Sequence, residues 1–157
     1  MKKIAITGPR EPPSVTSDLV DRWLRSLDHT DVMLFHGNAK GVDRMVRDLG
    51  RSLGFRVTAV EPHYGGTIPG SAAPLVRNAE MVSRVDSVVG FWHGKPYGGT
   101  LNTLWASQKI LGKKPTWFLT EKCDDLWAEH IFETTLKRPP LHWEEALRLW
   151  EQSKSRA

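Results

Sequence analysis

Short runs rich in β-branched residues alternate with amphipathic stretches along residues 1–120, and glycine and proline are frequent in the connections. Five runs predict strands, each too apolar for an edge half exposed to solvent: residues 3–7, 32–36, 56–61, 87–92 and 115–119. Three stretches place apolar residues on one helical stripe: 19–27, 42–53 and 101–111. Gly54 and Gly112 stand where left-handed caps would end helices. The alternation predicts an α/β fold, a three-layer Rossmann-like sandwich with a mostly parallel sheet of about five strands.

Residues 121–157 differ in kind from the expected domain of residues 1–120. Two amphipathic C-terminal helices are expected there, over 126–136 and 143–152. Because this extension holds no core large enough to fold alone, we expect it to pack on the same domain or, as the alternative, on a partner subunit. A homodimer through the tryptophan-rich extension is one form of that alternative.

The composition limits the cellular compartments and the kinds of binding site that we expect. No apolar run approaches the roughly 18 residues that a membrane span needs, and the apolar run near the N-terminus is too short for a secretory signal. Cys123 is the single cysteine, which excludes an intrachain disulfide and a zinc site built on paired cysteines. The six histidines show no metal-binding spacing. We therefore expect a cytoplasmic protein with no membrane attachment, no metal site and no cofactor.

Positive charge is concentrated in the first part of the chain. Residues 1–120 carry 16 basic and 10 acidic side chains, whereas residues 121–157 carry 6 and 8. The excess favours an anionic ligand in the first part, although a solvated basic surface gives the same balance. The sequence has no dense basic stripe with interleaved aromatic residues, which argues against an extended nucleic-acid groove.

In an open parallel sheet, ligands bind beyond the carboxyl ends of the strands, where loops lead into helices. The first such loop, residues 7–14, has neither the dinucleotide glycine motif nor a P-loop, which argues against an ordinary dehydrogenase or NTPase. It offers a tight turn at Gly8 and then Arg10, whose guanidinium can hold a phosphate or carboxylate with two hydrogen bonds.

The loop after the second expected strand, residues 36–43, has glycines on both sides of a helix start. Free N–H groups of a first turn and the helix dipole favour an anion there. The ordinary alternative is a simple turn in which Asp43 stabilises the helix start by a few tenths to about 1 kcal/mol.

The loop after the fourth strand repeats this pattern. Residues 94–100 lead into a helix expected to begin near Leu101, with Thr100 as its N-cap. Arg77 and Asn78 are expected at the start of the third helix. All three loops and this pair would meet in one crevice if the first, second and fourth strands are neighbours in the sheet.

Aromatic and imidazole side chains also follow the strands. Trp92 or Tyr97 could stack on a base, although a tryptophan at a strand end is more often part of the core. His36 and His93 could touch a ligand, although histidines near sheet ends are usually structural.

Three strings resemble a known superfamily: HGNAKGVD at 36–43, VRNAEM at 76–81 and DSVVGFWHGKPYGGT at 86–100. They resemble the SLOG superfamily, which unites DNA-processing protein A and the LOG phosphoribohydrolases, and within it the stand-alone cpYpsA-related (YspA-type) members. The resemblance covers residues 3 to about 119 and implies a Rossmann-like fold whose matched segments surround a nucleotide or nucleotide-derived ligand. The expected ligand-binding residues are Gly8, Pro9, Arg10, Gly37, Asn38, Gly41, Asp43, Arg77, Asn78, Gly98, Gly99 and Thr100.

One departure concerns the reaction of LOG enzymes. Their P-G-G-x-G-T-x-x-E motif ends in a glutamate needed to cleave the glycosidic bond of a nucleoside monophosphate, and Thr103 stands at that position here. Glycosidic cleavage requires a carboxylate near the anomeric carbon, and the nearby candidates are Asp43, Glu61 and Glu80. Because each has an ordinary structural explanation at a helix or strand end, no catalytic residue is assigned.

The leading hypothesis is binding, with sensing or processing, of a nucleotide-derived phosphate ligand in the crevice, with Arg10 and Arg77 as charge partners. Phosphoribohydrolase-like or deoxyribosyltransferase-like cleavage of an N-glycosidic bond is one alternative, and whether the protein is an enzyme stays open. Single-stranded DNA binding, as in DNA-processing protein A, is the other alternative and ranks below the small-molecule ligand.

Overall fold

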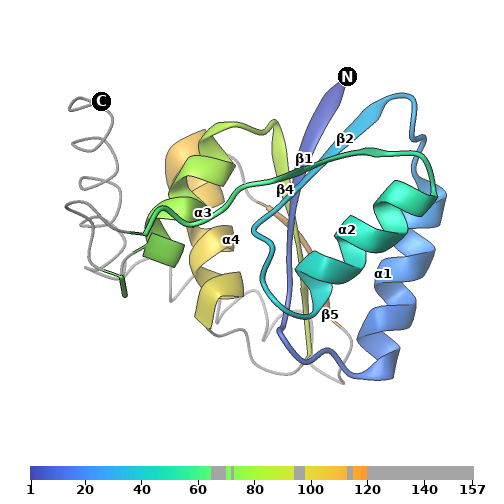
Figure 1. The fold of residues 1–157 in the computed structure, drawn as a ribbon, viewed down its shortest axis with the longest axis horizontal. Helices are drawn as coiled ribbons and strands as arrows, with labels where there is room; N and C mark the ends of the chain where they lie inside the picture. Colours follow the sequence, from blue (N-terminus) through green and yellow to red (C-terminus); the bar gives the residue numbers. More distant parts are fainter. Residues whose placement is uncertain (65–69, 72, 94–97, 113–114, 120–157) are drawn as a thin grey trace.

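The computed structural model describes residues 1–64, 70–71, 73–93, 98–112 and 115–119 (Figure 1). The predictions for the C-terminal extension and its two helices, for Cys123 and for Tyr97 lie outside the described residues. Within them, helices cover both faces of a parallel sheet, which confirms the predicted Rossmann-like α/β class.

The sheet consists of parallel strands throughout the part of the chain that is described. The strands are β1 Lys2–Thr7, β2 Val32–His36, β3 Arg56–Ala59, β4 Ser87–Trp92 and β5 Thr116–Leu119. They lie in the order β3-β2-β1-β4-β5, and each neighbouring pair is parallel. The first, second and fourth strands are thus neighbours, as the expected crevice requires, and their carboxyl ends meet at one edge of the sheet.

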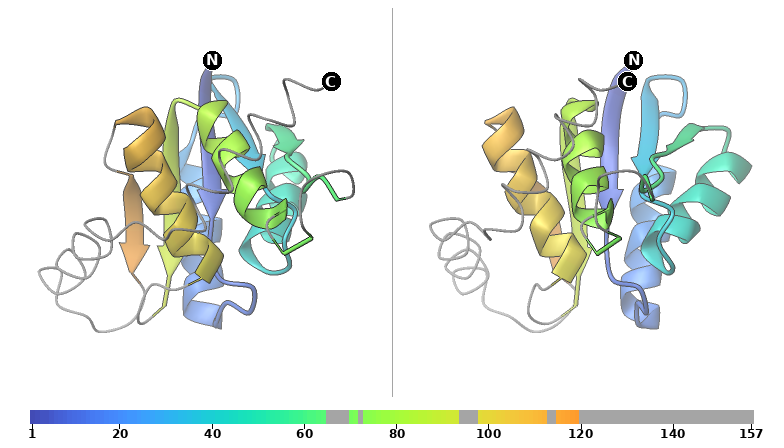
Figure 2. Two further views of the ribbon diagram at one scale, coloured as in Figure 1. Left: turned by 90° about the vertical axis from the view of Figure 1, so that its left-hand side faces the viewer. Right: turned by 60° about the vertical axis from the view of Figure 1, so that its left-hand side comes forward.

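Helices form the two outer layers. They are α1 Ser14–Ser26, α2 Val42–Ser52, α3 Ala73–Ser83 and α4 Gly98–Leu111. α1 packs beside α2 on one face of the sheet and α3 beside α4 on the other, as Figure 2 shows. None of these helices is long and apolar enough to cross a membrane.

The alternation of side chains along the central strands builds both cores. Ile4 and Ile6 of β1 pack with α1 and α2, whereas Ala5 between them belongs to the core under α3 and α4. Leu34 and Phe35 of β2 divide in the same way. Because both faces are covered, these strands read in the sequence as continuous apolar runs.

β3 differs from the prediction. It ends at Ala59 rather than at residue 61, and Arg56 and Ala59 are exposed. β2 is its neighbour in the sheet, and no strand of the described residues pairs with its other side. The prediction that no strand is a half-solvated edge is therefore wrong for β3, which is a short edge strand with charge and few large apolar side chains.

Two helix starts also differ from the prediction. α4 begins at Gly98, so Thr100 lies in the first turn and is not an N-cap. Gly98 has a φ of 60°, which glycine adopts freely and which lets the helical turn begin early. Arg77 and Asn78 lie in the middle of α3 rather than at its start. The expected left-handed caps at residues 54 and 112 are confirmed, with φ angles of 91° and 64°.

The chain reverses its direction across the sheet between β1 and β4. From β1 it moves outward through β2 to β3, then returns past β1 to β4 and continues to β5. The loops after β1 and β4 therefore lead to helices on opposite faces and separate from one another. Such a switch point is where open α/β sheets bind their ligands.

Candidate functional site

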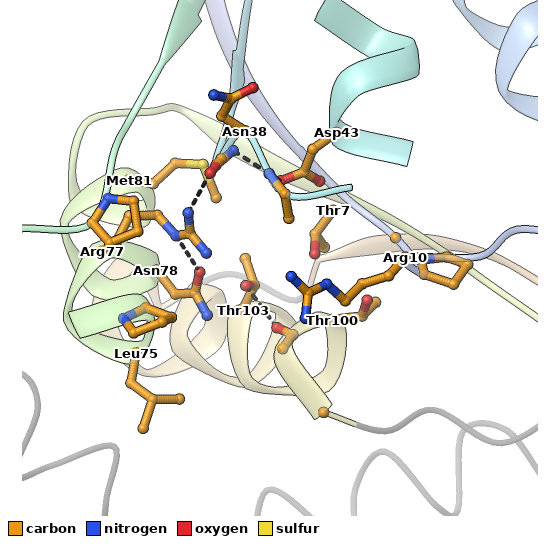
Figure 3. A pocket seen from close by; sticks show the side chains of 18 of the residues that line it. Thr7, Arg10, Asn38, Asp43, Leu75, Arg77, Asn78, Met81, Thr100 and Thr103 are labelled. Atoms are coloured by element: carbon orange, nitrogen blue, oxygen red, sulfur yellow. Dashed lines mark hydrogen bonds between the residues drawn. The ribbon is translucent and has the colours of Figure 1, made fainter. Parts of the chain in front are cut away.

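A pocket of about 650 Å³ lies at this switch point, within the range of roughly 300 to 1,000 Å³ typical of small-molecule sites. The loops after β1 and β2 and the start of α4 line it, together with α3 (Figure 3). All the expected ligand-binding residues except Gly41 line the pocket: Gly8, Pro9, Arg10, Gly37, Asn38, Asp43, Arg77, Asn78, Gly98, Gly99 and Thr100. The sheet order thus brings together residues that are distant in the sequence.

Asp43, in the first turn of α2, organises the loop after β2. Its Oδ2 accepts hydrogen bonds from the backbone N–H of Gly37 at 3.0 Å and of Ala39 at 3.2 Å. Burial raises the pKa of the Asp43 carboxyl to about 6, although these hydrogen bonds and the charges of Arg77 and Arg10 favour the ionised form. Two N–H groups of the loop that leads into α2 are therefore occupied by the protein's own carboxylate.

The loop after β1 also contacts the start of α2. The N–H of Val42 donates to the carbonyl of Pro9 at 3.2 Å, which ties the loop after β1 to this helix. Gly41 stands at the contact with a φ of 91°, and a side chain there would run into the carbonyl oxygens of Pro9 and Arg10. Gly41 is therefore required by backbone packing rather than by direct contact with the pocket.

The side chains of His36 and Asn38 are also used within the protein. His36 is fully buried, its Nδ1 accepts the N–H of Asn38 at 2.9 Å, and burial lowers its pKa to about 4. The amide of Asn38 donates to Glu61 Oε1 at 2.8 Å and accepts from Arg47 Nη1 at 3.1 Å. Both residues thus hold the loop in place, and His36 is neutral at pH 7.

Arg77 joins α3 to the loop after β2. The residue is 8% exposed, and its guanidinium donates from Nη1 to the carbonyl of Gly37 and from Nε to Asn78 Oδ1, the latter at 2.9 Å. A Cβ at Gly37 would lie 2.6 Å from this guanidinium, so glycine permits the approach. Asn78 in turn donates to Asn102 Oδ1 of α4 at 3.1 Å. Asn78 thus positions the arginine, whose Nη2 points into the pocket (Figure 3).

The start of α4 is more open than the start of α2. Gly98, Gly99 and Thr100 line the pocket, and the first turn contains no acidic residue. No described residue outside the helix accepts a hydrogen bond from these N–H groups. The hydroxyl of Thr103, which is 1% exposed, donates to the carbonyl of Gly99 at 2.8 Å. The positive end of the α4 dipole therefore faces the pocket without a charged partner among the described residues.

Two exposed arginines stand at the pocket with their guanidinium groups unengaged by the described residues. Arg10 follows β1, and Arg44 lies beside Asp43 in the first turn of α2. Arg10 and Arg77 point toward one another across the pocket in Figure 3. Arg44 was not among the ligand-binding residues predicted from the sequence. Its position next to Asp43, in a helix turn expected to face the ligand, could have indicated it.

Apolar side chains also line the pocket, and those of α3 were not predicted from the sequence. Leu75 and Met81 of α3 line it beside Trp92, which is 3% exposed and belongs to the core. Tyr64 adds an exposed ring. The sequence does not predict this lining, because a long connection separates α3 from β3 and the position of α3 depends on the folded structure.

The chemistry available to the pocket is that of anion binding with one buried acid. The described residues contain no group of three His, Cys, Asp or Glu side chains that could hold a metal ion. Of the carboxylates considered for glycosidic cleavage, Asp43 and Glu61 line the pocket, whereas Glu80 lies 3.2 Å from the ring of His63. Thr103 supplies no carboxylate, so cleavage stays an untested alternative.

Comparison with known proteins identifies the fold. No protein-family profile and no curated protein matches the chain. Among solved structures, it is similar to DNA processing protein A from Helicobacter pylori, described for its single-stranded DNA binding mode, with a TM-score of 0.63. Sequence identity is 17%, over 87% of this chain and 80% of that one. The finer resemblance to YspA-type members stays a prediction. At this identity the likeness establishes the fold alone, which is similar to that of DNA processing protein A.

Proposed function

We propose that the pocket binds a nucleotide or nucleotide-derived ligand through its phosphate, at the start of α4 between Arg10 and Arg77. The observation that carries this proposal is the gathering of arginines from the loop after β1, from α2 and from α3 around a helix start that has no acidic residue. Guanidinium groups bind phosphate with paired hydrogen bonds, and helix N-termini favour anions.

The remaining lining fits the rest of a nucleotide. The apolar side chains of Leu75, Met81 and Trp92 offer a base van der Waals contact. The volume of about 650 Å³ accommodates a ligand of nucleotide size. A ligand that combines a phosphate with a flat, weakly polar ring system matches both sides of the pocket.

The test is thermal unfolding of the full chain with AMP, GMP, CMP, UMP, ADP-ribose, NAD, cyclic nucleotides and inorganic phosphate, followed by calorimetric titration of each stabilising compound. A ligand at 100 times its Kd adds about 2.7 kcal/mol to the free energy of unfolding, a readily measured shift. Free base appearing during the incubation would reveal glycosidic cleavage. No shift and no heat of binding for any compound at millimolar concentration would refute the proposal.

The informative variant is Arg10→Ala rather than a substitution of Arg77. Arg10 is exposed and makes no hydrogen bond with the described residues, whereas Arg77 holds the loop after β2. Arg22→Ala is the matched control, because Arg22 is an exposed arginine of α1 outside the pocket. We expect Arg10→Ala to weaken nucleotide binding about tenfold, by loss of one charge-assisted contact, and Arg22→Ala to have less than a twofold effect.

Single-stranded DNA binding is the second candidate, favoured by the similarity to DNA processing protein A. The same arginines would then contact phosphates of a strand crossing the pocket. With about three phosphate contacts, affinity for an oligothymidylate falls about 20-fold between roughly 50 and 200 mM salt. Fluorescence anisotropy measures this, and the absence of binding at low salt would remove the candidate.

A further inference from the structure

The carboxylate of Asp43 has one oxygen that the protein does not use. Oδ2 accepts both loop N–H groups, and Oδ1 accepts no hydrogen bond from any described residue. The residue is 7% exposed and lines the pocket, on the side from which Arg10 also enters (Figure 3). Oδ1 is not one of the buried side-chain atoms that lack a partner, so it is open to the pocket, and a donor on a ligand can reach it.

The surroundings of Asp43 restrict what that donor can be. Arg10 and Arg77 both act on its charge, so the carboxylate lies near the groups proposed to hold the phosphate. A phosphate oxygen placed directly against Asp43 would be repelled. The part of a 5′-nucleotide that adjoins the phosphate is the sugar, whose hydroxyls are neutral donors.

The arrangement of the pocket lining places the base of a nucleotide away from Asp43. The apolar lining comes from α3 and β4, whereas Asp43 belongs to α2 on the opposite face of the sheet. A nucleotide that sets its base against Leu75, which lies away from Asp43 in Figure 3, therefore turns its sugar, rather than its base, toward Asp43.

We propose that Asp43 Oδ1 accepts a hydrogen bond from a sugar hydroxyl, so that the pocket selects single nucleotides with a free 2′ or 3′ hydroxyl over the interior of a DNA strand. Interior DNA nucleotides lack the 2′ hydroxyl, and their 3′ oxygen is esterified. The inference rests on the proposed nucleotide function and makes Asp43 a specificity residue of that site. Burial raises the pKa of Asp43 to about 6, so the acceptor is mostly ionised at pH 7.5 or above, the condition for the test.

Calorimetric titration at pH 8 with AMP, 2′-deoxy-AMP, 3′-deoxy-AMP and 2′,3′-dideoxy-AMP tests the inference, with the corresponding series for another base if that base binds better. We expect the ribonucleotide to bind about 10-fold or more tightly than the dideoxy compound, since hydrogen bonds to charged groups are strong. Loss with the 2′-deoxy or the 3′-deoxy compound identifies the hydroxyl.

Asp43→Asn is the decisive variant because its shape is conserved. The asparagine oxygen can accept the N–H groups of Gly37 and Ala39, and an amide then replaces the free carboxylate oxygen. We expect the preference for the ribonucleotide over the dideoxy compound to fall at least threefold in this variant, because the amide NH2 at the Oδ1 position donates and cannot accept a hydrogen bond from a sugar hydroxyl. Asp48→Asn, an exposed charge removal on α2 outside the pocket, is the matched control and keeps the full preference.

The outcomes separate the two proposals. Equal binding of AMP and dideoxy-AMP to the parent, or an unchanged preference in a folded Asp43→Asn variant, overturns the sugar-hydroxyl inference while nucleotide binding stands. The sugar-hydroxyl inference is also overturned if Asp43 affects the preference among bases but not the preference among sugars. The group that donates a hydrogen bond to Asp43 would then belong to the base. Failure of every nucleotide to bind overturns both.

Discussion

Two loops of this protein look alike in sequence and differ in the folded state. The loop after β2 and the start of α4 both carry glycines at a helix start, the pattern of an anion site. In the folded protein, Asp43 accepts the N–H groups of Gly37 and Ala39 in the loop after β2, and the carbonyl of Pro9 accepts an N–H group at the start of α2. No described residue outside α4 accepts the N–H groups at the start of that helix. The first helix start has an acidic residue and the second has none.

The difference teaches that a glycine-rich helix start is an anion site only where nothing in the protein already satisfies it. At α2 the chain supplies its own anion, Asp43, and leaves an acceptor toward the pocket. At α4 the positive dipole end stays available beside Arg10. The pocket is therefore electrostatically two-sided, which supports our proposal that a phosphate binds at the start of α4 rather than at both helix starts.

The largest expected effect comes from breaking the closed loop at Gly41. Gly41→Ala forces a side chain into a φ of 91° and against two backbone carbonyls, so we expect a loss of about 3 to 5 kcal/mol in the free energy of unfolding. Gly99→Ala is the comparison at the open helix start, where a Cβ meets no described atom within 4 Å, and we expect a change within about 1 kcal/mol. Urea unfolding measures both, and equal losses would contradict the contrast between the loops.

Arg77→Ala is expected to cost about 2 to 4 kcal/mol, since it leaves the carbonyl of Gly37 and Asn78 Oδ1 without their donors and opens a cavity. Arg10→Ala, at an exposed position, should change stability by less than about 0.5 kcal/mol. Chemical denaturation of the two variants beside the parent is the measurement. A stable Arg77→Ala protein would mean that the loop after β2 holds its shape without α3.

The pH dependence of stability separates the two buried titratable groups of the closed loop. Asp43 has a folded pKa of about 6 against a reference value of 3.8, so its stabilising contribution is full below pH 3.8 and is lost as pH rises through 6. His36 has a folded pKa of about 4 against 6.5, so its contribution is present above pH 6.5 and is lost as pH falls through 4. Between about pH 4 and 6 the two trends oppose each other.

Asp43→Asn removes one of these trends. In the variant the free energy of unfolding should fall more steeply on acidification from pH 6.5 to 4.5 than in the parent, by on the order of 1 to 3 kcal/mol. Urea unfolding at several pH values checks this. Parallel curves for parent and variant would mean that Asp43 titrates normally in the folded protein.

A modest effect is expected at the open helix start. Thr103→Val replaces the hydroxyl that donates to the carbonyl of Gly99 while it keeps the shape of a buried side chain. We expect a loss of about 1 kcal/mol and no more than a twofold change in nucleotide affinity, because the hydroxyl already bonds within the helix. A loss of binding above tenfold would show instead that Thr103 contacts the ligand.

Several features could be predicted from the sequence because they depend on neighbouring residues. Alternating apolar runs indicated the strands and helices, and β2 and β4 have the predicted bounds. Glycines with positive φ end α2 and α4 as expected. The clustering of the loops after β1, β2 and β4 followed from the general behaviour of parallel sheets, once the sheet order placed those strands together.

Tertiary structure decided which of the clustered groups are available to a ligand. Arg77 bonds to a carbonyl 40 residues away, and Asn38 bridges to Glu61 over 23 residues. Such partners depend on the distance between elements in the folded chain, which no local pattern records. The same holds for the exposed edge of β3 and for the apolar lining from α3. Local propensity thus determined the elements and the edge where the site lies. Packing decided that Asp43 and the carbonyl of Pro9 take N–H groups before and at the start of α2 while the start of α4 stays open, because buried N–H groups need acceptors.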